Sequence, residues 1–159
     1  MSITFAPHLW YAKDAEAAAH FYASVIPNSS VTRATPLPVA TPSGPAGSVI
    51  VVEFVLAGAP VMAITAGPHH PFNDAISFVL LCDTQSEIDL AWDGLLEGGG
   101  HPVACGWLKD RYGVSWQITS RRLGEMLADP DRERAARVAN AMLGMVKMDV
   151  AALERARSG

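Results

Sequence analysis

The order of strand-like and helix-like segments repeats once along this chain. Each copy begins with a segment rich in apolar and β-branched residues, continues into a helical pattern and ends in further strand-like segments. The two copies start about 70 residues apart, although no identity of letters marks the repeat. The repeat predicts an α+β fold of paired βαβββ modules, whose curved mixed sheet surrounds a cavity. We expect a single domain with a first half, a second half and a helical tail, over residues 1–66, 67–120 and 121–159.

The first half begins with a strand over residues 3–11, in which Pro7 marks an edge or a bulge. A helix follows, for which Asp14 offers the N-cap and Pro27 the end. Three further strands are expected over residues 29–36, 48–58 and 60–67. The proline- and glycine-rich stretch before the second of these strands predicts a loop.

The second half is expected to contain a strand, a helix and two strands, over residues 75–82, 84–100, 101–109 and 114–119. Asp83-Thr84 marks the start of the helix, and Gly98–Gly100 supplies its terminator. Lys109, Asp110 and Arg111 are interpreted as structural turn residues. In that turn, Asp110 is expected to bond the backbone.

The tail from Arg122 onward predicts helix, with a break at Pro130. Residues 131–156 are expected to form one amphipathic helix, because apolar side chains recur on or near one stripe. These side chains are Val138, Met142, Met145 and Met148. The stripe covers the chain's own sheet or meets a partner subunit, and adaptable methionines suit either role.

The composition is that of a globular protein with no nucleic-acid partner. Of 159 residues, 50% are hydrophobic and 18% are charged, which suits a chain with a buried core. The net charge of −4 lacks the basic excess that binding to a phosphate backbone requires. Arg132, Arg134 and Arg137 do cluster, but Asp131 and Glu133 alternate with them, and this favours a solvated helix face.

Three features predict a cytoplasmic protein with no membrane partner. The N-terminal segment lacks the basic and apolar regions of a signal peptide. No uncharged apolar run approaches the roughly 18 residues that a membrane-spanning helix needs. Cys82 and Cys105 are widely spaced, and they are expected to be reduced, buried thiols.

Four segments together resemble one protein family. The segment CGWLKDRYGVSWQI (105–118) is similar to the signature of the PhnB-like branch of the vicinal-oxygen-chelate (glyoxalase/bleomycin-resistance/dioxygenase) superfamily. Members of this branch carry the label 3-demethylubiquinone-9 3-methyltransferase domain. The other similar segments cover residues 8–29, 66–99 and 123–156, so the resemblance spans nearly the whole chain.

The resemblance implies paired βαβββ modules that usually assemble as a homodimer. In many relatives, four side chains from four strands bind a divalent metal, which chelates adjacent oxygens of the substrate. The corresponding strands of this chain offer His8, the segments 61–65 and 76–78, and Gln117. One imidazole and one neutral amide fall short of the three or more good ligands that a tight site needs. We therefore expect no cofactor, with a divalent metal as the less favoured alternative.

Methyl transfer is not favoured, despite the label of the family. A methyl donor such as S-adenosylmethionine usually binds a Gly-rich loop between a strand and the helix that follows it. Here Gly98–Gly100 follows a helix and precedes a strand, which is the position of a helix terminator.

The candidate site residues come from both halves. His8 is either a ligand or general base in the cavity, or a buried histidine bonded to backbone. Gln117 is expected to face the cavity, because Trp116 beside it packs under the helix, and its amide would orient a substrate carbonyl. His8 and Gln117 are thus the candidate catalytic residues. The candidate substrate-binding residues are Trp10, Phe72, Asn73, Ser77 and Trp107.

Two further groups are less favoured as functional sites. Cys105 is interpreted as structural, because the cations His101 and Lys109 are expected about 13 Å away along a single strand. The pair His69-His70 lies between prolines, which favours a fixed linker.

Two functions from different classes fit these residues. The favoured one is a small-molecule-binding protein without a complete catalytic metal site, because binding needs only shape, aromatic side chains and a few polar anchors. The alternative is an enzyme, either an isomerase, a lyase or a group transferase, that acts on a small oxygen-rich substrate, with or without a metal.

Overall fold

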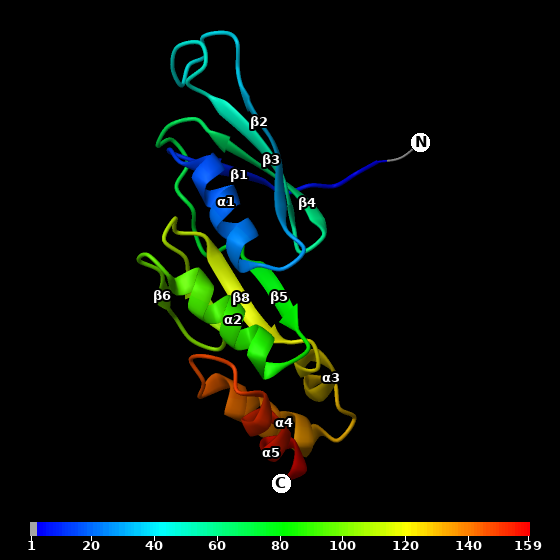
Figure 1. Ribbon diagram of the computed structural model, residues 1–159. Coiled ribbons are helices and arrows are strands. Elements are labelled where there is room, and N and C mark those ends of the chain that lie inside the picture. The colour runs from blue at the N-terminus through cyan, green and yellow to red at the C-terminus, as the bar shows by residue number, and fades with distance from the viewer. Residues whose placement is uncertain (1–2) are drawn as a thin grey trace. The chain divides into compact units, whose positions relative to one another are not determined.

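The computed structural model describes residues 3–159, which form two compact units. The first unit ends at Phe72 and the second begins at Asn73. Each unit contains one βαβββ module, and the second also contains the C-terminal helices (Figure 1). The predicted α+β class with paired modules is confirmed.

The first module has one helix and four strands, namely β1 (His8–Tyr11), α1 (Ala15–Val25), β2 (Ser30–Pro36), β3 (Ile50–Leu56) and β4 (Ala59–Thr65). The strand order is β1-β4-β3-β2, with β1 parallel to β4 and the other pairs antiparallel. Helix α1 packs on one face of this sheet. Ala15, Ala18 and Ala19 are buried on the helix, and their small side chains let it lie close to the strands.

The second module repeats this topology, with β5 (Phe78–Cys82), α2 (Gln85–Leu96), β6 (His101–Pro102), β7 (Trp107–Lys109) and β8 (Ser115–Ser120). Its strand order is β5-β8-β7-β6, and its first strand is again parallel to its last. The repeat predicted from the sequence is therefore present in the structure, where both modules have the same order of strands in the sheet. Gly98–Gly100 ends α2 as expected, and Gly98 has a positive φ of 75°.

Residues 101–109 form two strands instead of the single strand predicted. Cys105 and Gly106 adopt positive φ angles of 53° and 81°, and the Trp107 N–H donates to the Ala104 carbonyl. The chain therefore turns back on itself, and β6 pairs with β7. His101 consequently lies directly opposite Lys109, instead of at the far end of one strand.

The tail forms three helices, which are α3 (Leu123–Leu127), α4 (Arg132–Leu143) and α5 (Val150–Ser158). The prediction of one helix over 131–156 is wrong, because the carbonyls of Met145 and Val146 accept hydrogen bonds from the Cys105 and Gly106 N–H groups. Asp149 then caps α5 by accepting from the Ala152 N–H at 2.8 Å. Within the described residues, no helix is both long and apolar enough to cross a membrane.

The two module helices begin in different ways. Thr84 and Glu87 form a reciprocal capping box at α2. At α1, Asp14 occupies the N-cap position with φ 67°, but its side chain makes no capping bond, so its predicted role is wrong. The Ala15 N–H instead donates to the Thr65 hydroxyl, 3.1 Å away at the end of β4. The cap of α1 is thus supplied by a residue 50 positions away.

The start of α1 yields a first prediction. Thr65→Val removes the hydroxyl while keeping the shape, and we expect it to lower the free energy of unfolding by about 1 kcal/mol, as for loss of an N-cap. Asp14→Gly is the matched control. It should leave stability unchanged or slightly higher, because glycine tolerates the positive φ. Urea denaturation measures both variants, and equal losses would contradict the assignment of the cap to Thr65.

Candidate ligand-binding face

The buried carboxylate of Asp110 organises the turn between β7 and β8. Its Oδ1 accepts from the backbone N–H groups of Tyr112 and Val114, at 2.8 and 3.0 Å. Its Oδ2 accepts from Nε1 of Trp116 at 2.8 Å. These bonds replace the water that the carboxylate loses on burial. The predicted bonding of Asp110 to the turn backbone is confirmed, and the bond to Trp116 is an additional contact.

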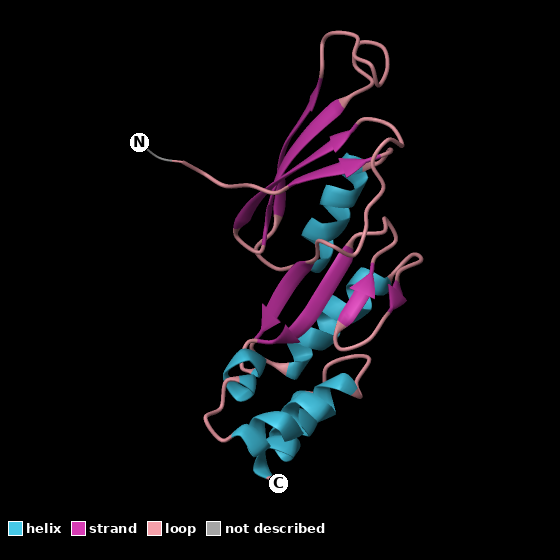
Figure 2. Cartoon of the chain, turned by 180° about the vertical axis from the view of Figure 1, so that it is seen from behind, coloured by secondary structure: helices cyan, strands magenta, loops and turns pink. Residues whose placement is uncertain are grey.

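The bond to Trp116 fixes which side of β8 faces α2. Trp116 and Ile118 are fully buried, as is Leu108, which pairs with Trp116 from β7. Successive side chains of a strand point to opposite faces, so Gln117 points away from α2. Figure 2 shows the second sheet from this side, with strands in front of the helix. Trp116 is buried as expected, and the expectation that Gln117 faces a cavity stays a prediction.

We call the side of the second sheet away from α2 the open face. It is formed by Val79, Leu81, Trp107, Lys109 and Gln117. In the register of the sheet, Gln117 lies between Val79 of β5 and Trp107 of β7. Val79 and Leu81 are 48% and 50% exposed. The open face is therefore an accessible apolar surface with an amide at its centre.

Ser77 holds the amide of Gln117 in place. Nε2 of Gln117 donates to the Ser77 hydroxyl at 2.9 Å, and both residues were predicted for the site. A glutamine amide has two N–H donors and a carbonyl acceptor, so this bond leaves one donor and the acceptor for a ligand. The structure thus brings three of the predicted residues, Ser77, Trp107 and Gln117, to one region of the second module.

Lys109 adds a positive charge to the same face. Its Nζ lies 2.9 Å from Oδ1 of Asp74, which also accepts from the Ser115 hydroxyl at 2.8 Å. Hydrogen bonds from Lys109 and Ser115 hold the pKa of the Asp74 carboxyl below its usual range. Lys109 is the last residue of β7, so its interpretation as a turn residue is wrong.

His8 and Trp10 lie in the first module, on the side of the sheet away from α1. His8 is exposed, so the alternative of a buried, backbone-bonded histidine is wrong. The indole of Trp10 donates to the Gly67 carbonyl at 2.8 Å, and the His70 ring meets it edge-on at 4.8 Å between centroids. In register, His8 lies opposite Met62 of β4.

The two remaining predicted residues belong to different units. The ring of Phe72 packs edge-on against Tyr11 in the first unit, with centroids 5.1 Å apart. Oδ1 of Asn73, in the second unit, accepts from the Ala75 N–H at 2.9 Å and so closes a local turn. Their expected contact with a substrate stays a prediction.

The residues at the strands that carry metal ligands in relatives do not fit a divalent cation. The first module presents His8 opposite the thioether of Met62, and in the second module Ser77 and Gln117 bond each other. Hard or borderline cations require several nitrogen or oxygen ligands, usually imidazoles and carboxylates. In the described part of the chain, no group of three or more His, Cys, Asp or Glu side chains is placed to hold a metal ion.

The cysteines differ in environment. Cys82 is buried, and its burial, with the charges of Glu87 and Asp83, raises the pKa of the thiol to about 11. A thiol with such a pKa is a poor nucleophile at neutral pH. Cys105 is only partly buried, so the prediction of two buried thiols is wrong for this residue.

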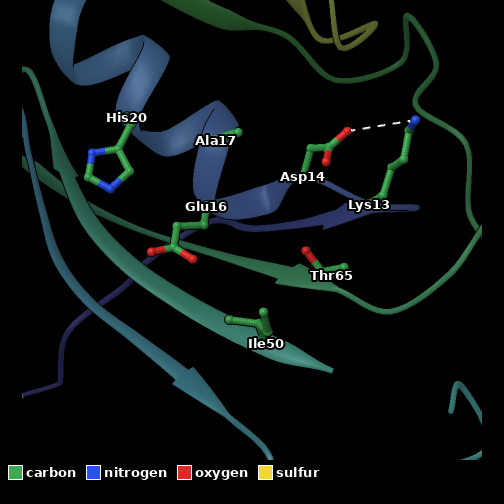
Figure 3. Close-up of a pocket in the computed structure, with 7 residues that line it drawn as sticks. All are labelled: Lys13, Asp14, Glu16, Ala17, His20, Ile50 and Thr65. Atoms are coloured by element: carbon green, nitrogen blue, oxygen red, sulfur yellow. Dashed lines mark ion pairs between the residues drawn. The ribbon is translucent and has the colours of Figure 1, made fainter. Parts of the chain in front are cut away.

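An open depression of about 520 Å³ lies elsewhere in the first module, beside the start of α1 (Figure 3). Its lining residues are Lys13, Asp14, Glu16, Ala17, His20, Ile50 and Thr65. The Thr65 hydroxyl is engaged in capping α1. None of the residues predicted for the site lines this depression.

The sequence interpretation missed Lys109, Val79 and Leu81 as parts of the open face, and Asp74 as the partner of Lys109. One signal was available, since Lys109 follows Trp107 by two positions and a strand places such residues on the same face. The pairing of Lys109 with Asp74 had no signal, because it joins a strand to a distant loop.

Comparison with known proteins agrees with this architecture. The family described as 3-demethylubiquinone-9 3-methyltransferase matches residues 3–119. A putative 3-demethylubiquinone-9 3-methyltransferase, a PhnB protein from Bacillus cereus, is 31% identical, with a TM-score of 0.65 over 74% of this chain and 99% of its own. No curated protein matches the chain.

Two more distant structures share the fold. The fosfomycin resistance protein FosX from Mesorhizobium loti is 12% identical, with a TM-score of 0.57 over 80% of this chain and 98% of its own. A glyoxylase/bleomycin resistance protein/dioxygenase domain from Frankia sp. EAN1pec is 11% identical, with a TM-score of 0.50 over 74% of this chain and 96% of its own.

The repeated strand order and these similarities define a protein of the vicinal-oxygen-chelate superfamily. Within it, the chain belongs to the PhnB-like family described as 3-demethylubiquinone-9 3-methyltransferase.

The Asp110 turn yields a second prediction. Asp110→Ala leaves two backbone N–H groups and the Trp116 indole without their acceptor, and we expect the free energy of unfolding to fall by about 3 kcal/mol or more. Asp83→Ala is the control. It breaks the exposed ion pair with Arg121 and should cost less than about 1 kcal/mol. Chemical denaturation followed by tryptophan fluorescence compares the two, and a similar small loss in both would contradict the role of Asp110.

Proposed function

We propose that this protein binds a small organic molecule that carries oxygen atoms, on the open face and without a metal ion. One observation carries the proposal. The amide of Gln117, bonded to Ser77 at 2.9 Å, lies between Val79 and Trp107 on the side of the sheet away from α2.

The chemistry of this face suits recognition of a carbonyl or hydroxyl beside an apolar group. Ser77 restrains the Gln117 side chain, so less rotamer freedom is lost when a ligand binds. The free N–H and carbonyl oxygen of the amide then orient oxygen atoms of the ligand. The Trp107 ring offers a flat apolar surface on which an aromatic or alicyclic part can lie.

The relatives support a small-molecule ligand. The similar structures include a fosfomycin resistance protein and a glyoxylase/bleomycin resistance protein/dioxygenase domain, and both names refer to small molecules. These structures are only 12% and 11% identical in sequence to this chain, so the likeness concerns the fold. It supports a small molecule as the class of ligand and does not say which molecule.

Two features favour binding over catalysis in this proposal. The thioether of Met62 stands opposite His8, and this weakens a metal-assisted mechanism. Gly98–Gly100 terminates α2, with the Gly100 N–H donating to the Leu96 carbonyl at 3.1 Å. These glycines therefore serve a structural purpose that requires no methyl donor.

An enzyme remains the second candidate, favoured by the exposed imidazole of His8. An accessible imidazole can act as a general base towards an oxygen-rich substrate, as in an isomerase, a lyase or a group transferase. In that case His8→Ala would abolish turnover, whereas in the binding proposal it leaves ligand affinity on the open face unchanged.

A cytoplasmic location, which derives from the sequence, and a homodimeric state, which the family resemblance implies, are further parts of the proposal. Leu143 and Val146, at the end of α4 and just beyond it, are 64% and 50% exposed. In this proposal these two side chains are contacts for a partner subunit.

A third prediction uses PRODAN, a neutral fluorescent naphthalene with a ketone. We expect it to bind with a blue shift of its emission, and we expect Trp107→Ala to weaken binding about tenfold through loss of aromatic contact. Gln117→Leu should weaken binding about fivefold through loss of the hydrogen bond. Neither EDTA nor added zinc should change the affinity.

The control pair consists of Val79→Ser and Val146→Ser. These valines are similarly exposed, at 48% and 50%, but Val79 lies on the open face and Val146 lies just beyond α4. Only the first should weaken binding, and neither is expected to impair folding. Equal affinity of both variants, or dependence of binding on zinc, would contradict the proposed function.

A further inference from the structure

Lys109 is placed to select the charge of a ligand on the open face. It follows Trp107 by two positions on β7, so the two side chains leave the strand on the same side. Lys109 pairs with Ser115, and Trp107 pairs with Gln117. Lys109 and Gln117 are therefore diagonal neighbours, about 7 Å apart at their backbones. The ammonium of Lys109, the indole of Trp107 and the amide of Gln117 therefore belong to neighbouring residues on the same face of the sheet.

The partner of Lys109 can be replaced. Its ammonium contacts Oδ1 of Asp74 at 2.9 Å, but the Asp74 side chain is 67% exposed and that of Lys109 is 28% exposed. Because the Asp74 side of this ion pair is exposed, water and salt screen the pair and it contributes little stability. Asp74 also keeps a second partner in the Ser115 hydroxyl, so loss of the ammonium would leave it bonded and hydrated.

The surroundings of the ammonium favour an anion. His101 on β6 lies directly opposite Lys109 in the sheet. The apolar side chain of Trp107 lies beside Lys109 on β7, and that of Val79 lies beyond the amide on β5. A molecule with an apolar body and one terminal negative charge matches an ammonium next to these apolar side chains.

We infer that Lys109 makes the open face selective for ligands that carry an oxyanion, such as a carboxylate, a sulfonate or a phosphonate. The oxyanion takes the place of the Asp74 carboxylate at the ammonium, while the apolar body lies on Trp107 beside Gln117. This inference rests on the proposed function, and it adds the charge class of the ligand. Asp74 acts as an internal competitor that lowers the affinity for anions.

The test uses two fluorescent dyes that differ in one group. 1-Anilinonaphthalene-8-sulfonate carries a sulfonate, and N-phenyl-1-naphthylamine is the same aromatic system without it. The wild-type protein should bind the sulfonate more tightly, and high NaCl should reduce this preference. Competition by benzoate, phenylphosphonate and inorganic phosphate then shows which oxyanion is preferred and whether an apolar body is needed.

Four variants isolate the charge effect. Lys109→Gln should weaken binding of the sulfonate about fivefold and leave the neutral dye unchanged. Asp74→Asn should strengthen sulfonate binding about threefold, because the competitor loses its charge. The double variant should behave like Lys109→Gln. Lys13→Gln, which changes an exposed lysine in the first module, is the matched control and should have no effect.

The outcomes separate this inference from the proposed function. If Val79→Ser weakens both dyes but Lys109→Gln leaves their ratio of affinities unchanged, the inference is overturned and the binding face remains. A decrease in sulfonate affinity in Asp74→Asn would also overturn it. If Val79→Ser affects neither dye, the open face is not the binding site, and both the function and the inference fail.

Discussion

The hydrogen bond between the buried Asp110 carboxylate and the Trp116 indole decides which side chains of the second module a ligand can reach. It holds Trp116 under α2, and the alternation of a β-strand then directs Gln117 to the opposite side. Trp107 and Val79 follow, because the register of the sheet places them beside Gln117. The composition of the open face thus follows from the buried Asp110 carboxylate and its bond to Trp116.

The parts of the fold that depend on local pattern could be predicted from the sequence. The repeat of strand and helix patterns gave the two modules, and Asp110 was correctly assigned to the turn. The failures have a common physical cause in tertiary hydrogen bonds. Thr65 caps α1 from another strand. The carbonyls of Met145 and Val146 bond the turn at Cys105 and Gly106, which breaks the predicted tail helix and accompanies the split of the predicted strand.

The candidate site was predictable to the extent that strand alternation determines it. Gln117 and Trp107 were expected near a ligand, and the structure places them side by side. Lys109 was assigned to a turn, because the neighbouring residues of its segment have turn chemistry. Its contact with Asp74 depends on the path of the loop before β5, which no local pattern encodes. The expectation of a poor donor set for a metal depends only on residue types.

The four tryptophans provide the most direct test of the central claim, that ligands bind the open face of the second module. In ¹H–¹⁵N NMR spectra each indole N–H gives a separate signal, and those of Trp10 and Trp116 are already hydrogen bonded to Gly67 and Asp110. On titration with PRODAN, we expect the Trp107 indole and the Gln117 side-chain amide to shift, while the Trp116 signal stays in place. Shifts centred on Trp10, with Trp107 unchanged, would contradict the account.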